Sequence, residues 1–169
     1  MQLVNCDYGL LKNMGCNGGL MDKAFKYAES TAITTEENYP YVAKKESCDK
    51  SKLEGATLKV SSYVDVAKND PEALKAQLEK GPVSVAIEAD KMVFQQYTSG
   101  VITGSACGTN LDHGVLAVGW GTENGTDYYL VKNSWASTWG DKGYVKIGIE
   151  DGAGVCGIQS GPPSQPVTN

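Results

Sequence analysis

The sequence predicts an α+β fold in two parts, a partial helical, loop-rich half over residues 1–80 and an antiparallel, β-barrel-like half over residues 81–161. Two observations predict this division. Apolar residues recur at helical spacing in the first part, and short alternating apolar runs separated by turn residues fill the second. With 41% hydrophobic residues among 169, the chain can bury a core as one domain or two small halves. The Pro-rich end, residues 162–169, is expected to form an extended tail.

Two helices are expected in the first part. Residues 19–30, "GLMDKAFKYAES", place their apolar side chains on one helical face. Residues 69–82, "NDPEALKAQLEKGP", carry stronger end signals, because Asn69 or Asp70 can cap the first turn and Pro71 fits inside it. A glycine follows the last helical residue, as is common at helix ends.

Strands are expected in the second part wherever β-branched and aromatic residues alternate with others. The expected strands cover residues 82–89, 114–121, 127–135 and 143–149. The segment "TENGT", residues 122–126, is a hairpin turn signal that joins the second strand to the third. The segment "MVFQQY", residues 92–97, is expected to form a helical turn between strands.

Composition excludes several classes of partner. The formal net charge is −5, and the densest lysine patch, "KKESCDKSK", is interleaved with acids, so no nucleic-acid surface is expected. No apolar run approaches the roughly 18 residues of a membrane span. The N-terminus "MQLVNCDYGLL" lacks the basic start and long apolar region of a signal peptide, so no targeting signal is expected within this sequence.

The five cysteines indicate disulfides rather than a metal centre. They form no CxxC pair, and one histidine cannot complete a Cys/His zinc site, so neither a metal nor a cofactor is expected. Scattered single cysteines predict an oxidising location, either lysosomal or vacuolar or secreted. The sequon "NGT" makes Asn124 a candidate glycosylation site. An odd number of cysteines leaves one without a partner.

The only histidine, His113, is a candidate catalytic base. It opens one expected strand, and Asn133 lies near the end of the next, so a hairpin would bring the two together. An amide oxygen beside an imidazole fixes the ring's tautomer and orientation, as a general base requires. Trp135 could cover this pair. The alternatives are a structural histidine, or Asp112 as the orienting group, although a sequence neighbour points to the other face of the strand.

Six stretches carry a resemblance to a known family. In order they are "GCNGGLMDKAF", "NYPYVAKKESC", "KGPVSVAIEA", "CGTNLDHGVLAVGWG", "YYLVKNSWASTWGDKGYVKI" and "GVCGI". From Gln2 to about Gly161 the chain resembles the papain family of cysteine peptidases, nearest its cathepsin L-like branch. The resemblance implies a papain-like two-part fold and peptide-bond hydrolysis by a thiolate–imidazolium pair. It implies that His113 pairs with the nucleophile, that Asn133 orients His113, and that Trp135 shields their contact.

The nucleophile itself is not expected in this sequence. The family's C-G-[SA]-C-[WY] cysteine stands about 130–150 residues before its histidine and asparagine, which places it before Met1 together with the oxyanion glutamine. The resemblance pairs Cys6 with Cys48 and Cys107 with Cys156, and leaves Cys16 as the orphan whose partner also lies upstream. We therefore expect a C-terminal portion that is inactive alone. A partner chain or segment is expected to fill the place of the family's central helix.

The resemblance also implies substrate-binding residues. The backbone of Gly19 would hydrogen-bond an extended peptide, with Gly18 and Asp112 close by. The main specificity pocket would be lined by Leu20, Met21, Ala86, Leu111 and Gly114, with Gly161 at its floor. A pocket without charge is expected to prefer bulky apolar or aromatic side chains of a peptide or protein substrate. Ala136 stands where the family has glycine, and a positive φ there would cost about 1 kcal/mol or more.

Two other functions compete with a cysteine endopeptidase. A non-catalytic descendant could keep the groove as a peptide-binding or structural module. A hydrolase built on Ser134 is weaker, because no second histidine is present to serve that serine. Cys16 is also a weak substitute nucleophile, since it heads a glycine turn and no base stands near it in the sequence.

Overall fold

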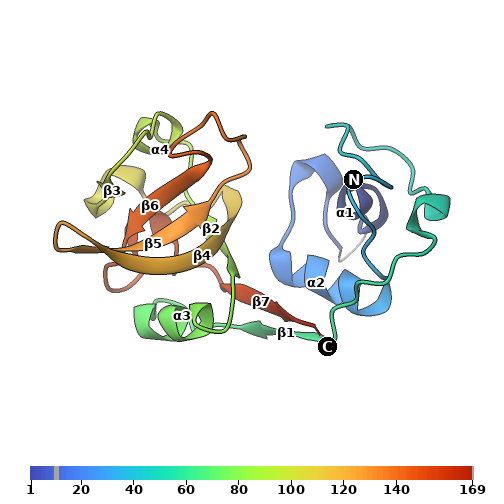
Figure 1. Cartoon of the computed structure of the whole chain (residues 1–169), viewed down its shortest axis with the longest axis horizontal. Coiled ribbons are helices and arrows are strands. Elements are labelled where there is room, and N and C mark those ends of the chain that lie inside the picture. Colours follow the sequence, from blue (N-terminus) through green and yellow to red (C-terminus); the bar gives the residue numbers. More distant parts are fainter. Residues whose placement is uncertain (10–11, 169) are drawn as a thin grey trace. The chain divides into compact units, whose positions relative to one another are not determined.

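The structure is a computed structural model that describes residues 1–9 and 12–168. The chain divides into two compact units (Figure 1). Unit 1 comprises Met1–Val64 with Pro166–Asn169, and unit 2 comprises Asp65–Gln165. The division therefore falls earlier than the expected boundary after residue 80. The physical reason is the helix α3 (Pro71–Leu78), whose Leu74 is fully buried in the core of unit 2.

The strands form one open sheet in the order β1-β7-β2-β4-β5-β6-β3. Their bounds are β1 Ser62–Asp65, β2 Val83–Ile87, β3 Val101–Ile102, β4 His113–Glu123, β5 Thr126–Lys132, β6 Tyr144–Gly148 and β7 Ser164–Val167. The pairings that link β2, β4, β5 and β6 are antiparallel, as expected, and β7 also pairs antiparallel with β2. The short β3 pairs parallel to β6, so the sheet is mixed rather than wholly antiparallel.

The β4–β5 hairpin has two features that set its register. Its turn contains only Asn124 and Gly125, whose φ angles of 50° and 80° are those of the type I′ turn that suits twisted strands. Farther along, the pairing shifts between Ala117 and Gly119, which leaves Val118 as the extra residue of a β-bulge.

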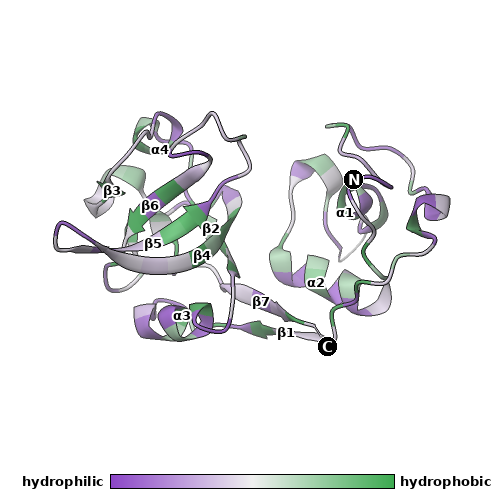
Figure 2. Cartoon of the chain, viewed as in Figure 1, coloured by the Kyte–Doolittle hydropathy of each residue, from purple (hydrophilic) through white to green (hydrophobic). Residues whose placement is uncertain are grey.

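The core of unit 2 lies along alternate residues of the central strands. In β2, Val83, Val85 and Ile87 are fully buried while the residues between them are partly exposed. The helix α3 is capped by Asp70, whose side chain accepts a hydrogen bond from the backbone N–H of Ala73 at 2.9 Å. In Figure 2, α3 shows both apolar and polar colours, as an amphipathic helix does.

The C-terminal residues belong to the sheet, because Ser164–Val167 forms β7. The Nε2 group of Gln165 donates to the carbonyl oxygens of Gly81 at 2.7 Å and Pro82 at 3.1 Å. Ser164 donates from its hydroxyl to Asp65. The expected tail is thus extended, but it is held by strand pairing and side-chain bonds.

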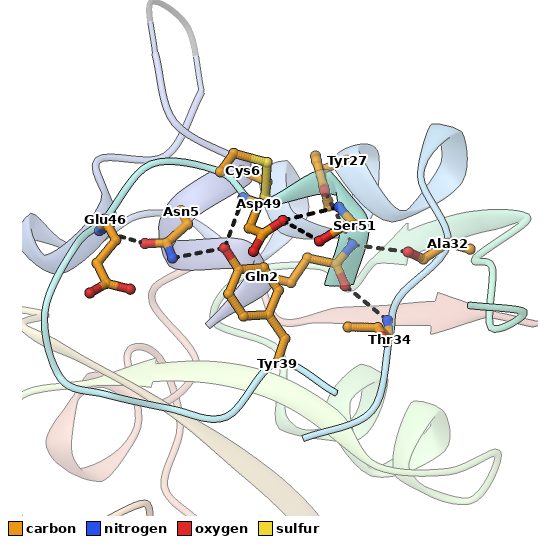
Figure 3. The surroundings of a disulfide bond; sticks show 11 residues. Gln2, Asn5, Cys6, Tyr27, Ala32, Thr34, Tyr39, Glu46, Asp49 and Ser51 are labelled. Carbon is orange, nitrogen blue, oxygen red and sulfur yellow. Dashed lines mark hydrogen bonds between the residues drawn. A yellow bond between two sulfur atoms is a disulfide. The ribbon is translucent and has the colours of Figure 1, made fainter. Parts of the chain in front are cut away.

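Outside residues 10 and 11, unit 1 contains the α-helices α1 (Gln2–Cys6) and α2 (Met21–Ser30) and long connecting loops. The disulfide between Cys6 and Cys48 ties α1 to a loop (Figure 3). Around it, the buried amide of Gln2 donates to Ala32 O at 2.9 Å and accepts from Thr34 N at 2.8 Å. This side-chain amide thus holds the backbone on both sides of Ile33, which itself forms an isolated bridge with Leu58.

Short helical turns complete the chain. They are α4 (Met92–Gln95) and the 3-10 turns Gly15–Asn17, Lys50–Leu53, Gly104–Cys107 and Val155–Gly157. The helical turn expected at residues 92–97 is therefore present. Across residues 1–9 and 12–168, no helix has the length and apolar character needed to cross a membrane.

Candidate active site

His113 and Asn133 are brought together by the β4–β5 hairpin. His113 is the first residue of β4, and Asn133 directly follows β5 and continues its ladder by donating from its N–H to Gly143 O at 2.9 Å. The imidazole Nε2 lies 2.8 Å from Asn133 Oδ1. Asn133 is only 8% exposed, so water competes poorly for this bond.

The same amide oxygen determines the tautomer of His113. Oδ1 of Asn133 also accepts the backbone N–H of Ser134 at 2.8 Å, and a backbone N–H can only donate. The oxygen must therefore face both neighbours, and Nε2 of His113 must carry the proton that it donates to Asn133. This leaves the lone pair on Nδ1 of His113 to accept a proton from another group.

An aromatic cluster covers this pair. The Trp135 ring stacks on the His113 ring, with centroids 5.1 Å apart and an interplanar angle of 27°. Phe94 meets Trp135 edge-on at 5.5 Å, and Trp139 meets Trp135 edge-on at 5.3 Å. The sequence interpretation named Trp135 but missed Phe94 and Trp139. Only the helical turn containing Phe94 and the tryptophan-rich "NSWASTW" stretch pointed toward them.

One polar atom of the site has no partner. Nδ2 of Asn133 is buried and makes no hydrogen bond within the described residues. Turning the amide over would not help, because Ser134 N–H would then face an NH₂ group. An unsatisfied buried donor costs about 1–3 kcal/mol, so an incoming acceptor at this position would be favoured.

Asp112 does not orient the imidazole. Its carboxylate accepts the backbone N–H of Ala89 at 2.8 Å, and its own N–H donates to Ile87 O at 3.0 Å. Both bonds tie the residue before His113 to the end of β2. This agrees with the expectation that Asp112 points away from the histidine.

The residues of the expected substrate pocket fall in both units. In unit 2, Gly114 is paired with Ala86 across the β2–β4 ladder. A Cβ atom on Gly161 would lie 3.1 Å from Leu111 Cδ1 and 3.5 Å from Ala86 Cβ. These four residues therefore converge on one place in unit 2, where the absence of a side chain on Gly161 lets Leu111 approach closely.

The other expected pocket residues, Gly18, Gly19, Leu20 and Met21, lie in unit 1 at the start of α2. The backbone N–H of Leu20 donates to Asn13 Oδ1 at 2.7 Å. A Cβ on Gly19 would overlap the Asn13 side chain, so glycine is needed for this close approach. The side chain of Leu20 is 53% exposed, unlike that of a core residue.

The cysteines and the remaining candidate residues are placed as follows. The structure contains the disulfides Cys6–Cys48 and Cys107–Cys156, and Cys16 is free and exposed. Unit 2, all of whose residues are described, therefore contains no free thiol. Asn124 is exposed at the hairpin tip. Ala136 has a φ of 67°, the left-handed conformation that was expected to strain it.

Comparisons with known proteins agree on one family. The model of the papain family cysteine proteases matches residues 1–165. Probable cysteine protease RD21C of Arabidopsis thaliana is 50% identical over 161 residues, which is 93% of this chain and 35% of that protein. Vignain of Ricinus communis is also 50% identical over 161 residues, which is 93% of this chain and 44% of that protein.

Solved structures give the same result. The Carica candamarcensis cysteine protease CMS1MS2, in complex with E-64, matches with a TM-score of 0.90 and 34% identity, over 99% of this chain and 76% of that one. The proform of Amb a 11, a ragweed pollen cysteine protease, matches with a TM-score of 0.92 and 41% identity, over 99% of this chain and 51% of that one.

Proposed function

Because the chain belongs to the papain family of cysteine proteases, we propose that it contributes the catalytic base and part of the substrate groove to a cysteine endopeptidase. The observation that carries this proposal is the His113–Asn133 bond, in the tautomer that leaves Nδ1 free. The chain spans 35% and 44% of the two relatives named above. The activity is therefore proposed for an assembly that includes residues outside this sequence.

In the proposed reaction, Nδ1 of His113 takes the proton of a cysteine thiol supplied by a C-G-[SA]-C-[WY] segment. The thiolate attacks the peptide carbonyl carbon, and the imidazolium then gives its proton to the leaving amine. A water molecule, deprotonated by the same imidazole, hydrolyses the resulting thioester and releases the acid and the thiol. Asn133 keeps the ring in place, and Trp135 limits access of water to the bond between them.

Two features support a segment that docks on this chain. The buried Nδ2 group of Asn133 has an unused proton, which a carbonyl oxygen of the segment would accept. Cys16 is free and exposed, so its sulfur is available to a cysteine of the same segment. The segment would also bring the nucleophile that unit 2 lacks.

The proposed substrate is an extended peptide with a bulky apolar or aromatic side chain next to the cleaved residue. Support comes from the uncharged group formed by Ala86, Leu111, Gly114 and Gly161, which converge in unit 2. Gly18, Gly19, Leu20 and Met21 of unit 1 and Asp112 of unit 2 are proposed as further substrate-binding residues. Backbone groups of Gly19 would bind the peptide as an added strand does.

The two disulfides belong to an oxidising compartment, and within that class we propose a lysosomal or vacuolar location, or secretion. The exposed Asn124, in the sequon with Gly125 and Thr126, is proposed to carry an N-linked glycan there. Asn124 follows the last residue of β4 whereas His113 is the first, so a glycan would lie about 35 Å from the base at the usual rise per residue.

The proposal is tested by assaying a fluorogenic peptide with the chain alone and with the chain joined to the C-G-[SA]-C-[WY] segment. Only the joined form is expected to turn over substrate. His113→Ala should lower its kcat/KM by about 10²–10⁴-fold, the usual contribution of a general base. Ser134→Ala is the matched control, because its backbone N–H and not its side chain serves Asn133.

Two outcomes would contradict the proposal. Turnover by the chain alone, lost in His113→Ala, would mean that the nucleophile lies within this sequence, and loss of activity in Ser134→Ala would identify it as that serine. No turnover by a joined form that is folded and binds peptide would favour the competing function, a non-catalytic peptide-binding module.

A further inference from the structure

Glu88 is a charged residue buried in unit 2 that the proposed reaction does not use. It follows the last residue of β2, and its side chain is only 2% exposed. Its carboxylate pairs with the ammonium group of Lys91 at 2.9 Å. It also accepts the backbone N–H of Asn110, which lies in the loop before β4. A buried carboxylate with two such partners holds in place the segments of chain that carry those partners.

The loop of residues 108–112 is fitted closely around this carboxylate. Gly108 has a φ of 76°, and a Cβ atom there would overlap the Glu88 carboxylate. Asn110 in the loop donates to the Glu88 carboxylate after β2. In return, the Ala89 N–H after β2 donates to the Asp112 carboxylate in the loop at 2.8 Å. Glu88 and Asp112 therefore hold the middle and the end of this loop to the same point after β2.

The loop carries the residue whose position decides the shape of the proposed pocket. Leu111 stands between Asn110 and Asp112, is 39% exposed, and packs against the backbone of Gly157 and Gly161. Its backbone is held from both sides, because Glu88 holds Asn110 and bonds to Ala89 and Ile87 hold Asp112. His113 comes two residues later, but the Asp112 and Asn133 contacts hold it separately.

We propose that Glu88 is a positioning residue for substrate specificity, because it holds Leu111 against the apolar pocket through the N–H of Asn110. The proposal rests on the proposed function, since the pocket is assigned by it. Glu88 touches neither substrate nor the reacting atoms. Its loss is expected to widen the pocket or disorder its wall. The hydrogen bond between His113 and Asn133 is expected to stay in place.

The test compares two fluorogenic peptides that differ only next to the cleaved residue, where one has leucine and the other glycine. In the joined form, Glu88→Ala should lower the leucine-to-glycine ratio of kcat/KM by about tenfold, within the range that one apolar contact contributes to discrimination. A folding defect that only reduces the amount of active enzyme lowers both values equally and leaves the ratio unchanged.

Two variants sharpen this comparison. Glu88→Gln should keep the ratio within about twofold, because its amide oxygen still accepts the N–H of Asn110. Glu150→Ala is the matched control: its carboxylate also accepts a backbone N–H, that of Gly104 at 2.9 Å, at the exposed start of the 3-10 turn that precedes residues 108–112. A ratio unchanged in Glu88→Ala, or lowered equally in Glu150→Ala, would overturn the proposal.

A second readout does not depend on peptidase activity. Amide hydrogen exchange of residues 108–112 should be about tenfold faster in Glu88→Ala than in Glu88→Gln, and unchanged in Glu150→Ala. If the joined form is inactive but this exchange pattern appears, the proposed function fails while Glu88 still holds the loop. Exchange that does not respond to Glu88→Ala would refute the role of Glu88 whatever the activity.

Discussion

Replacing Ala136 by glycine should stabilise unit 2. Ala136 has a φ of 67°, a conformation that costs an L-residue with a Cβ roughly 1–2 kcal/mol and costs glycine little. The side chain of Ala136 is exposed, so its removal sacrifices little packing. Glycine also gains freedom in the unfolded chain, which offsets roughly 0.5–1 kcal/mol. The net increase in the free energy of unfolding is therefore expected to be about 0.5–1 kcal/mol.

The measurement is urea denaturation followed by tryptophan fluorescence. All three tryptophans, Trp120, Trp135 and Trp139, lie in unit 2, so the signal reports the unfolding of that unit. With a denaturant slope typical of a small protein, the midpoint should rise by about 0.3–0.5 M urea. A slope that differs between the variants would show that more than the stability of the native state has changed.

The matched control is Ala106→Gly. Ala106 is also exposed, but it lies in the 3-10 turn Gly104–Cys107 and is not among the residues with positive φ. Glycine there should lower the free energy of unfolding by about 0.5–1 kcal/mol. If Ala136→Gly lowers stability as Ala106→Gly does, the backbone at Ala136 is not strained.

Three further predictions concern other parts of the chain. Burial raises the pKa of the Asp7 carboxyl, so the free energy of unfolding should fall as pH rises from the ordinary pKa of 3.8 through the folded pKa. In urea titrations followed by circular dichroism, Asp7→Asn should remove this fall. The same pH profile in Asp7→Asn as in the unaltered chain would contradict the prediction. Replacing Cys107 and Cys156 together by alanine opens a loop of sequence separation 49 and should lower the free energy of unfolding by about 4 kcal/mol, with a loss under 1 kcal/mol as the contrary result. Chain secreted from eukaryotic cells should lose the mass of one glycan on treatment with a peptide N-glycosidase, and Asn124→Gln should lose none; equal mass before and after treatment of the unaltered chain would disprove the modification.

The sequence was most informative where short-range signals specify the structure. The dipeptide at Asn124 forces a two-residue turn, and this turn brings the ends of the two flanking strands together. The nearness of His113 and Asn133 along the hairpin could therefore be inferred from the turn, whereas the bulge at Val118, which puts both side chains on one face, could not. The helix α3 was equally accessible, because its cap at Asp70 and its proline lie within one turn of its start.

The features that were missed depend on contacts between distant residues. The strand β3 has two residues and exists because it pairs with β6, more than forty positions later. Residues 65–80 join unit 2 because Leu74 is buried there, and nothing in their own pattern reveals which half they pack on. Glu88 gives no local signal either, since a glutamate after a strand is usually a solvated residue.

The hairpin's extra residue, Val118, has a consequence for how the site can be altered. On the His113 side of the bulge, Leu116 is opposite Lys132, whereas on the turn side Gly119 is opposite Leu130. Positions two apart on a strand share a face, so the first register, continued, puts Asn133 on the same face as His113. The register on the turn side, continued toward His113 without a bulge, would put Asn133 on the face opposite to His113.

The face on which the Asn133 side chain lies therefore depends on whether the number of residues between His113 and Asn133 is odd or even. Deleting Val118 alone would keep the turn and the hydrophobic character of both strands, yet it would turn the amide of Asn133 away from the imidazole. Removing one residue from each strand would keep the parity. In any redesign of this hairpin, the number of residues between His113 and Asn133 can thus change only in steps of two.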